Sequence, residues 1–262
     1  MRFKGSKVVV TGACGVFGTW IAEAFAREGA ALCLSDNRAT DLAALADRLG
    51  PGTLTHPTEL TDATSIDGLA SLIEARWGAP DIVINNAGVY PRGLMLEIDA
   101  AEWDRIMDVN LRAPFLLTRA LARLMILRGV KGSMIMVSSG AARRMRNGSA
   151  PYCISKTAVE RLAKGFALEL AEYGIRVNTV EPGFAPGSKV SPLSETYVQK
   201  MVAGIPLQRS SGPGDTPEAI LFLCSEQASF ITGSTLSVDG GNSVGTFEPG
   251  GLKADDLRLP AR

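Results

Sequence analysis

Seven short runs of apolar residues alternate with longer stretches of helical periodicity along nearly the whole 262-residue chain. Most runs are continuously apolar, which is typical of strands that helices cover on both faces of a sheet. They predict strands over Lys7–Thr11, Ala31–Ser35, Thr53–Thr55, Asp81–Asn85, Ser133–Ser138, Arg176–Glu181 and Thr235–Val238. The stretches between them predict helices over Thr19–Glu28, Asp41–Leu49, Thr64–Trp77, Ala101–Leu127, Ala150–Glu172 and Asp215–Ser225. This alternation predicts an α/β fold, namely a single-domain, doubly wound, parallel seven-stranded sheet that is Rossmann-like, with helices on both faces.

The alternation continues without a linker, an internal repeat or a low-complexity tract, so we expect one domain over residues 1–243. Two segments fall outside it. Residues 184–213 are rich in Pro, Gly and Ser around a short helical pattern at Glu195–Val202, which is typical of a lid over a substrate site. Residues 244–262 follow the last predicted strand without any period, and we expect them to form a C-terminal tail.

Charge and composition exclude several classes of protein. The 27 basic residues balance 27 acidic ones, so the chain lacks the electrostatic footprint of a nucleic-acid-binding protein. The four cysteines are too far apart in sequence for a metal knuckle or redox pair, and the single histidine, His56, offers little material for a zinc site or a Ser-His-Asp triad. We expect no metal. Neither a signal peptide nor an apolar run of the ~18 residues needed to cross a membrane is apparent, so we expect a cytoplasmic protein.

The first predicted strand runs into a glycine-rich turn, VVVTGACGVFG at residues 8–18. Gly12, Gly15 and Gly18 lie between this strand and a helix N-terminus, where unpaired N–H groups bind anions and glycine lets a pyrophosphate approach the backbone. The turn lacks the Lys-Ser/Thr pair of a nucleotide-triphosphatase P-loop. By itself the spacing is a weak signal, and a purely structural turn is the alternative.

Asp36 strengthens the nucleotide interpretation. It ends the run ALCLSD, 18 residues after Gly18, where an acidic residue meets the ribose 2′-OH of a dinucleotide. Because a carboxylate there repels a 2′-phosphate, the sequence favours NAD over NADP. Arg38 lies two residues further on and would weaken that preference if it faced the nucleotide; the alternative is a solvated charge at a helix start.

Tyr152 and Lys156 are four residues apart at the start of a predicted helix, which places them on one face. A phenol has a pKa of about 10, too high for acid–base work near neutrality. A neighbouring ammonium group stabilises the phenolate and lowers that pKa, so the pair can move a proton without a histidine. Any helix can hold these two residue types by chance, so the pair alone is not specific.

Several of these positions gather at one predicted edge of the sheet, because Gly12, Asn85, Ser139 and Pro182 all fall at the carboxyl ends of strands, outside which ligands bind. With this arrangement, residues 5–242 resemble the short-chain dehydrogenase/reductase (SDR) family, in its short branch. The resemblance rests on the motifs TGACGVFG, Asp36, NNAG at 85–88, DVNL around Asn110, Ser139, the Tyr152/Lys156 pair, IRVNTVEPG at 175–183 and ITGSTLSVDGG at 231–241.

The resemblance implies an NAD-dependent oxidoreductase that interconverts a secondary alcohol and a ketone by hydride transfer. It implies that Tyr152 is the catalytic acid/base and that Lys156 binds the nicotinamide ribose and lowers the pKa of the tyrosine. Ser139, rather than Ser138, would bind the substrate oxygen, and Asn110 would hold a water that relays the proton from Lys156 to solvent. The implied cofactor-binding residues are Gly12, Gly15, Val16, Phe17, Gly18, Asp36, Glu59, Leu60, Asn86, Ala87, Gly88, Tyr152, Lys156, Pro182, Gly183 and Ser188.

Three positions depart from the family pattern. Val16 stands where the short branch usually has glycine, so Gly12, Gly15 and Gly18 resemble the spacing of the extended branch; we interpret this as a reshaped turn that still binds pyrophosphate. Glu59 in ELTD replaces the usual aspartate beside the adenine. Gly187 replaces a threonine that holds the carboxamide in many relatives, and Ser188 would substitute for it.

The sequence does not identify the substrate, for which we expect a small or medium-sized cyclic, sugar-like, steroid-like or aromatic alcohol or ketone. One or more of Arg143, Arg144 and Arg146 would meet an anionic substrate, such as a carboxylate, phosphate or sulfonate; the alternative is a solvated or subunit-facing charge cluster. Two alternatives to an NAD-dependent dehydrogenase stay open: an NADPH-dependent ketone reductase, and a non-catalytic dinucleotide-binding sensor of the same fold. The resemblance also implies a homo-oligomer, a tetramer or a dimer.

Overall fold

One parallel sheet forms the centre of the protein. The computed structural model describes residues 1–188, 192–248 and 250. Its seven strands lie in the order β3-β2-β1-β4-β5-β6-β7. They are β1 Lys7–Thr11, β2 Ala31–Asp36, β3 Leu54–Pro57, β4 Ile82–Asn85, β5 Ser133–Val137, β6 Arg176–Pro182 and β7 Thr235–Val238. The predicted fold class is confirmed, and every predicted strand lies within two residues of an observed one at each end.

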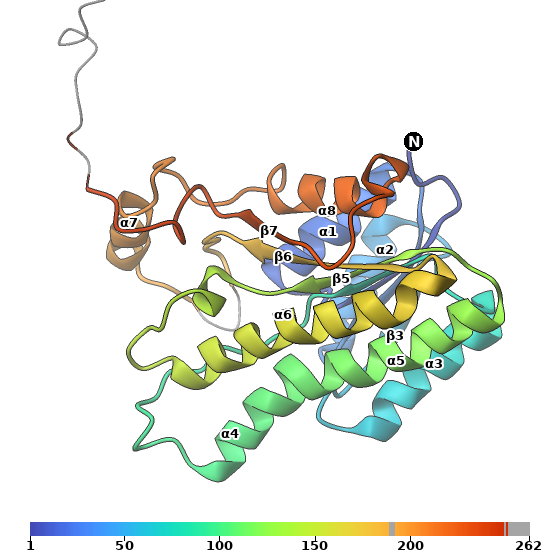
Figure 1. Cartoon of the computed structure of the whole chain (residues 1–262), viewed down its shortest axis with the longest axis horizontal. Helices are drawn as coiled ribbons and strands as arrows, with labels where there is room; N and C mark the ends of the chain where they lie inside the picture. The colour runs from blue at the N-terminus through green and yellow to red at the C-terminus, as the bar shows by residue number, and fades with distance from the viewer. Residues whose placement is uncertain (189–191, 249, 251–262) are drawn as a thin grey trace, which may run out of the picture.

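Helices cover both faces of the sheet (Figure 1). On one face lie α1 Val16–Arg27, α2 Ala39–Leu49 and α8 Thr216–Cys224, and on the other lie α3 Ala63–Trp77, α5 Ala113–Leu127 and α6 Ala150–Leu170. The shorter elements are α4 Ala100–Met107, α7 Glu195–Ala203 and single turns at Gly140–Ala142, Ala171–Tyr173 and Glu226–Ala228. No helix among the described residues is both long and apolar enough to span a membrane.

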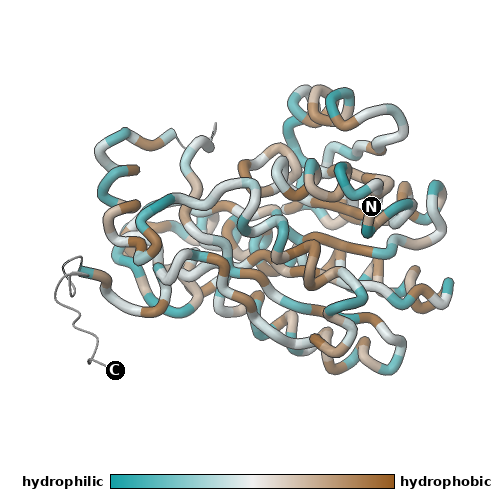
Figure 2. Tube along the Cα trace, turned by 90° about the horizontal axis from the view of Figure 1, so that it is seen from above, coloured by the Kyte–Doolittle hydropathy of each residue, from teal (hydrophilic) through white to brown (hydrophobic). Residues whose placement is uncertain are grey.

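The apolar runs are continuous because successive residues of a strand serve two different cores. In β1, Val8 and Val10 pack with Ile21 and Phe25 of α1, whereas Val9 packs on the opposite face with Leu117 of α5. All six side chains are at most 1% exposed. Figure 2 shows the resulting hydrophobic segments running through the middle of the molecule.

One predicted helix is wrong. Residues 101–127 do not form a single helix but three segments: α4, a π-helical turn over Asp108–Arg112, and α5. Pro114 explains the widening, because a proline four residues after Asn110 has no N–H to donate to the Asn110 carbonyl, as a continuous α-helix requires. Helical periodicity alone does not reveal such a turn.

The strand order reverses between β1 and β4, which pair with β2 and β5 respectively on their outer sides. A crevice forms where the crossovers of two neighbouring strands run to opposite faces, and it opens at the carboxyl ends of the strands. The fold therefore places the residues after β1, β2, β4 and β5 around one crevice.

Candidate active site

The glycine turn joins β1 to α1 at this crevice, and close packing explains two of its glycines. Gly12 has φ +60°, and a Cβ there would lie 2.7 Å from the Cα of Ala87. A Cβ on Gly18 would lie 2.0 Å from the Gly12 carbonyl oxygen. Gly15 is the N-cap of α1 with extended backbone, and Val16 is the first helical residue, a position without a positive φ. The departure at residue 16 therefore leaves the turn intact.

The N-terminus of α1 is open for an anion. Its cap makes no side-chain hydrogen bond, and its first turn contains no acidic residue. The first N–H groups of a helix have no partner within the helix and carry partial positive charge. Together with the narrow glycine turn, this helix end fits a pyrophosphate.

Asn86 holds this crevice together. Its side-chain Nδ2 donates to the carbonyl oxygens of Thr11 at 2.9 Å and Gly12 at 3.0 Å. The Thr11 hydroxyl in turn accepts from the backbone N–H groups of Asn86 and Ala87 at 3.1 and 3.2 Å. These bonds tie the end of β1 to the end of β4, so Asn86 and Ala87 help to determine the shape of the glycine turn.

Asp36 ends β2 and is 8% exposed. Its carboxylate accepts from the Cys14 backbone N–H at 3.0 Å, which brings the carboxylate to the glycine turn. It also accepts from the N–H and Nε of Arg38, both at 3.1 Å, and Arg38 pairs with Asp41 at 3.1 Å as well. Arg38 is thus not the freely solvated charge that was the alternative, but an ion-paired neighbour of the carboxylate.

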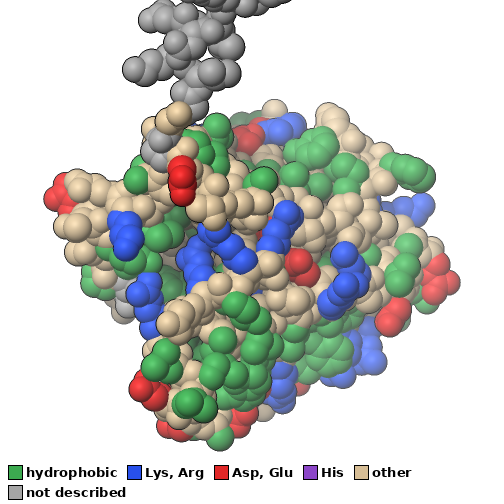
Figure 3. All heavy atoms as spheres, turned by 60° about the vertical axis from the view of Figure 1, so that its left-hand side comes forward, with side chains coloured by type: hydrophobic (Ala, Val, Ile, Leu, Met, Phe, Trp, Pro, Cys, Tyr) green, Lys and Arg blue, Asp and Glu red, His purple; other side chains and the backbone are tan. Residues whose placement is uncertain are grey.

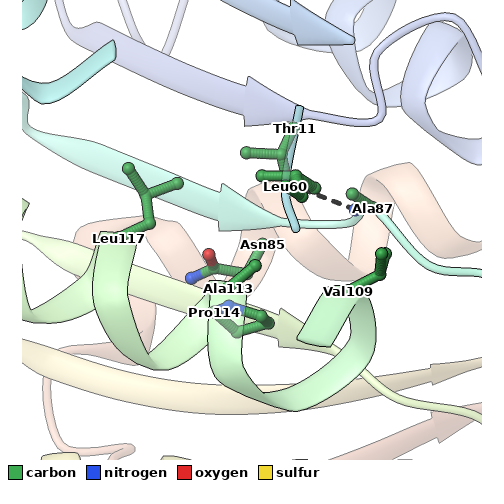
Figure 4. Close-up of a pocket in the computed structure, with 8 residues that line it drawn as sticks. All are labelled: Thr11, Leu60, Asn85, Ala87, Val109, Ala113, Pro114 and Leu117. Carbon is green, nitrogen blue, oxygen red and sulfur yellow. Dashed lines mark hydrogen bonds between the residues drawn. The ribbon is translucent and has the colours of Figure 1, made fainter. Parts of the chain in front are cut away.

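The neighbouring residues Glu59 and Leu60 have different surroundings. The carboxylate of Glu59 accepts from the N–H and hydroxyl of Thr61 at 3.1 and 2.9 Å, so it is held within its own turn. Leu60 lines a small cavity of about 10 Å³ beneath the crevice, beside Thr11 and Ala87. Figure 4 shows these three on one side of the cavity and Val109, Ala113, Pro114 and Leu117 on the other, with Asn85 between them.

Tyr152 and Lys156 meet on one face of α6, as their spacing predicts. The Lys156 Nζ lies 5.9 Å from the centre of the Tyr152 ring and donates to the Val137 carbonyl at 2.8 Å. Lys156 is 4% exposed, and burial lowers its pKa to about 8. The Tyr90 ring meets the Tyr152 ring edge-on, with 6.2 Å between their centres, and partly closes the site.

The pKa of the Tyr152 hydroxyl is raised by burial, which disfavours the phenolate. A hydrogen bond with Ser139 and the positive charge of Arg146 act in the opposite direction and lower that pKa. The sequence pointed to Lys156 as the group that lowers it. In the structure, Ser139 and Arg146 contribute to the lowering, and desolvation is the largest effect.

The two adjacent serines face opposite ways. Ser139 lies beside the Tyr152 hydroxyl, and its Oγ accepts from the Ala141 N–H at 3.2 Å. Ser138 is buried, and its Oγ donates to Glu160 at 2.8 Å and to the Lys156 carbonyl at 3.1 Å. Of the two serines, it is therefore Ser139 that lies beside the Tyr152 hydroxyl.

Asn110 lies in the π-helical turn, with its side chain 1% exposed. Its Oδ1 accepts from the Val89 N–H at 2.8 Å, and its Nδ2 donates to the Val89 carbonyl at 2.8 Å and to Ser155 Oγ at 3.0 Å. A Cβ on Gly88 would lie 3.3 Å from both Asn110 Oδ1 and Lys156 Nζ. Asn110 and Lys156 thus converge at Gly88, which has to be small.

Pro182, Gly183 and Ser188 lead from the sheet into the predicted lid. Gly183 donates its N–H to the Val238 carbonyl at 2.9 Å, and a Cβ there would lie 2.7 Å from Ser211 Oγ. The Ser188 hydroxyl accepts from the Tyr90 hydroxyl at 3.3 Å. Residues 189–191 of the lid and residues 249 and 251–262 of the tail lie outside the described residues.

Two neighbouring carboxyl groups, the partly buried Glu160 and the buried Glu181, lie behind the site and were missed by sequence reasoning. Glu181 has no exposed side-chain surface and pairs with Arg143 at 2.8 Å. It also accepts a short hydrogen bond from the Ser237 hydroxyl. Burial and the neighbouring Glu181 raise the pKa of Glu160 to about 6. No sequence spacing signals this pair, because the two residues come from α6 and β6.

Comparisons with known proteins identify the family. The family model described as enoyl-(acyl carrier protein) reductase matches residues 12–243. The chain is 33% identical to the 3-oxoacyl-[acyl-carrier-protein] reductase FabG of Escherichia coli (strain K12), over 92% of this chain and 98% of that protein. It is 30% identical to the sorbitol dehydrogenase of Cereibacter sphaeroides, over 92% of this chain and 99% of that protein.

Two solved structures share the fold. A short-chain type dehydrogenase/reductase from Mycobacterium marinum has a TM-score of 0.84 and 31% identity, over 92% of this chain and 96% of that one. A 3-ketoacyl-(acyl-carrier-protein) reductase from Brucella melitensis, complexed with NADH, has a TM-score of 0.84 and 31% identity, over 92% and 99%. With the family model, the full-length relatives and the shared fold in agreement, the chain belongs to the short-chain dehydrogenase/reductase family of oxidoreductases.

Proposed function

We propose that this protein is an NAD-dependent oxidoreductase that interconverts a secondary alcohol and a ketone. The observation that carries the proposal is the meeting of Ser139, Tyr152, Lys156 and Asn110 at the crevice edge beside an open glycine turn. The substrate is a small or medium-sized molecule, since Tyr90 and the segment after Pro182 bound the site.

The residues present fit a nicotinamide dinucleotide. The cradle at Gly12 and Gly18, which a Cβ would fill, leaves room for the pyrophosphate at the start of α1. Asp36 faces the same turn and would accept from a ribose hydroxyl. Lys156 would bind the second ribose, and Pro182 and Gly183 would flank the nicotinamide. When bound, this group supplies a hydride acceptor or donor.

The chain's own residues would move the proton. Ser139 would donate a hydrogen bond to the substrate oxygen and orient it toward the Tyr152 hydroxyl. Tyr152 would take the alcohol proton in oxidation and return it in reduction. Lys156 would stabilise the phenolate form, and Asn110, which converges with it at Gly88, would hold the water that passes the proton on.

The preference for NAD is the finer part of the proposal. The carboxylate of Asp36 supports it, as does the NADH in the Brucella melitensis structure. Arg38 favours the alternative, an NADPH-dependent ketone reductase, because its guanidinium lies 3.1 Å from Asp36 and would be near a 2′-phosphate. Fluorescence titration with NADH and NADPH distinguishes the two, and tighter NADPH binding would contradict our interpretation of Asp36.

Turnover is tested with a Tyr152→Phe variant. We expect the wild type to form NADH with members of a secondary-alcohol panel, and the variant to bind NADH equally but to turn over at least a hundredfold more slowly, the usual contribution of a general acid/base. A non-catalytic dinucleotide sensor would show no turnover in either protein. Equal rates in both proteins would remove Tyr152 from the mechanism.

We propose a homo-oligomer, a tetramer or a dimer, because exposed apolar side chains lie on α5 and α6, where Phe115 is 39% and Leu168 is 83% exposed. Light scattering of the purified protein tests this, and a monomeric mass would refute it.

We also propose a cytoplasmic location. The four unpaired cysteines support it, because disulfides are rare in the reducing cytosol.

A further inference from the structure

The three arginines between Ser139 and Tyr152 do not form one cluster. Arg143 pairs with the buried Glu181 and so has a structural partner. Arg144 donates to Asn242 Oδ1 at 3.3 Å and to the Gly245 carbonyl at 3.5 Å. The guanidinium of Arg146 is exposed and forms neither a hydrogen bond nor an ion pair with residues 1–188, 192–248 or 250. Only this arginine is free to meet a ligand.

Arg146 lies at the mouth of the site. Its loop is joined to the loop that follows β4, because the Gly93 N–H donates to the Gly148 carbonyl at 3.0 Å. The loop after β4 also carries Tyr90, whose ring contacts that of Tyr152. The charge of Arg146 reaches the Tyr152 hydroxyl, whose pKa it lowers. Figure 3, which brings the left-hand side of Figure 1 forward, shows several Lys and Arg side chains across the middle of the view, with an acidic side chain among them.

A second cation stands on the neighbouring loop. Arg92 donates from Nη2 to the Tyr197 hydroxyl at 2.6 Å, and its guanidinium lies 5.2 Å from the centre of the Tyr197 ring. Both contacts join the loop after β4 to α7 of the lid. Because tyrosine is neutral, they leave the charge of Arg92 without compensation.

Two carboxylates close to the loop that follows Ser139, those of Glu181 and Asp239, are already engaged. Glu181 is held by Arg143 and Ser237, and Asp239 accepts from the N–H groups of Gly241 and Ser243 at 2.9 and 2.8 Å. No ion pair joins a carboxylate of the described residues to either Arg92 or Arg146. The mouth of the site thus carries two positive charges without a counter-ion from this part of the chain.

We propose that Arg146, with Arg92 on the neighbouring loop, binds an anionic group of the substrate, which is therefore an oxo or hydroxy compound carrying a carboxylate or a phosphate. The inference rests on the proposed function, because it names the substrate class of the same site. A guanidinium suits both anions, since its planar N–H groups form paired, charge-assisted hydrogen bonds with two oxygens. The anion supplies the missing counter-charge while Ser139 and Tyr152 bind the reacting oxygen.

The test uses matched ketones on the full chain saturated with NAD⁺, or with NADP⁺ if that binds instead. Ketone and nucleotide are then both oxidised, so binding is measured by calorimetry without turnover. Acetoacetate is compared with methyl acetoacetate, and dihydroxyacetone phosphate with dihydroxyacetone. We expect one anion to bind about tenfold or more tightly than its neutral partner, the lower limit for one charge-assisted hydrogen bond. The pair that shows the preference identifies carboxylate or phosphate.

Variants assign the effect to Arg146. We expect Arg146→Gln to abolish the preference and Arg146→Lys to retain part of it. Arg144→Gln removes the same charge from the same loop and should keep the preference, provided that all three variants unfold at the wild-type temperature. Equal loss in both glutamine variants, or neutral ketones binding as tightly as anionic ones, would overturn the proposal. If neither NAD⁺ nor NADP⁺ binds, the dehydrogenase proposal is refuted instead. The role of Arg146 is then decided by comparing the binding of acetoacetate to the free wild-type protein and to the free Arg146→Gln variant.

Discussion

The glycine turn permits a quantitative test through a Gly18→Ala variant. The new Cβ would lie 2.0 Å from the Gly12 carbonyl oxygen and 2.8 Å from the Ala13 Cα, both backbone atoms that cannot rotate away. Overpacking against rigid surroundings costs up to about 3 kcal/mol, and alanine regains about 1 kcal/mol of helix propensity. The expected net loss is about 2 kcal/mol, or roughly 4–8 °C in melting temperature for a chain of this size.

Gly15→Ala is the matched control. A Cβ there approaches only the Gly12 oxygen, at 3.3 Å, and the extended backbone of Gly15 accepts alanine. We expect a change of less than about 1 kcal/mol, the cost of a weaker N-cap. Thermal unfolding and NADH fluorescence are measured on both variants, and we expect only Gly18→Ala to lose most of its NADH affinity. If the two variants melt together, the steric reasoning fails.

The surroundings of Glu160, Cys14 and Asn86 lead to three further predictions. The pKa of the Glu160 carboxyl is raised to about 6 in the folded protein, so the unfolded chain releases this proton at lower pH and the stability of the fold falls as the pH rises from about 4.5 to 6. Relative to Glu160→Gln, the wild type should lose about 1 kcal/mol of unfolding free energy between pH 4.5 and 7.5, a value that allows for the partial exposure of Glu160. Urea unfolding measures this, and a difference between the two proteins that does not change with pH would refute it. Burial and Asp36 raise the pKa of Cys14 to about 11, so iodoacetamide at pH 8 should label this thiol roughly a hundredfold more slowly than a free cysteine, as followed by peptide mass spectrometry; rapid labelling would contradict it. Asn86→Ala removes donors to two backbone carbonyls and should cost about 2 kcal/mol in urea unfolding, and an unchanged midpoint would show that these bonds do not support the crevice.

The predictable part of the fold rests on local pattern. Strands covered on both faces are apolar on both sides, as Val8–Val10 of β1 and Met134–Val137 of β5 are, and that requirement is visible without knowing their neighbours. The spacing of Tyr152 and Lys156 places them on one helix face for the same local reason. The π-helical turn at Asn110 was not predictable in this way, since it depends on Pro114 and on hydrogen bonds to Val89 and Ser155.

The sequence alone determined the parallel α/β architecture, the family, and the identity of the residues at the carboxyl edge, because periodicity and motif spacing act over a few neighbouring residues. Only the tertiary structure decided how those residues are charged and paired. Arg143 is neutralised by Glu181, 38 positions away on β6, whereas Arg146 in the same run stays unpaired among the described residues. Burial and ionic contacts depend on which strand ends lie side by side, and no local pattern contains that information.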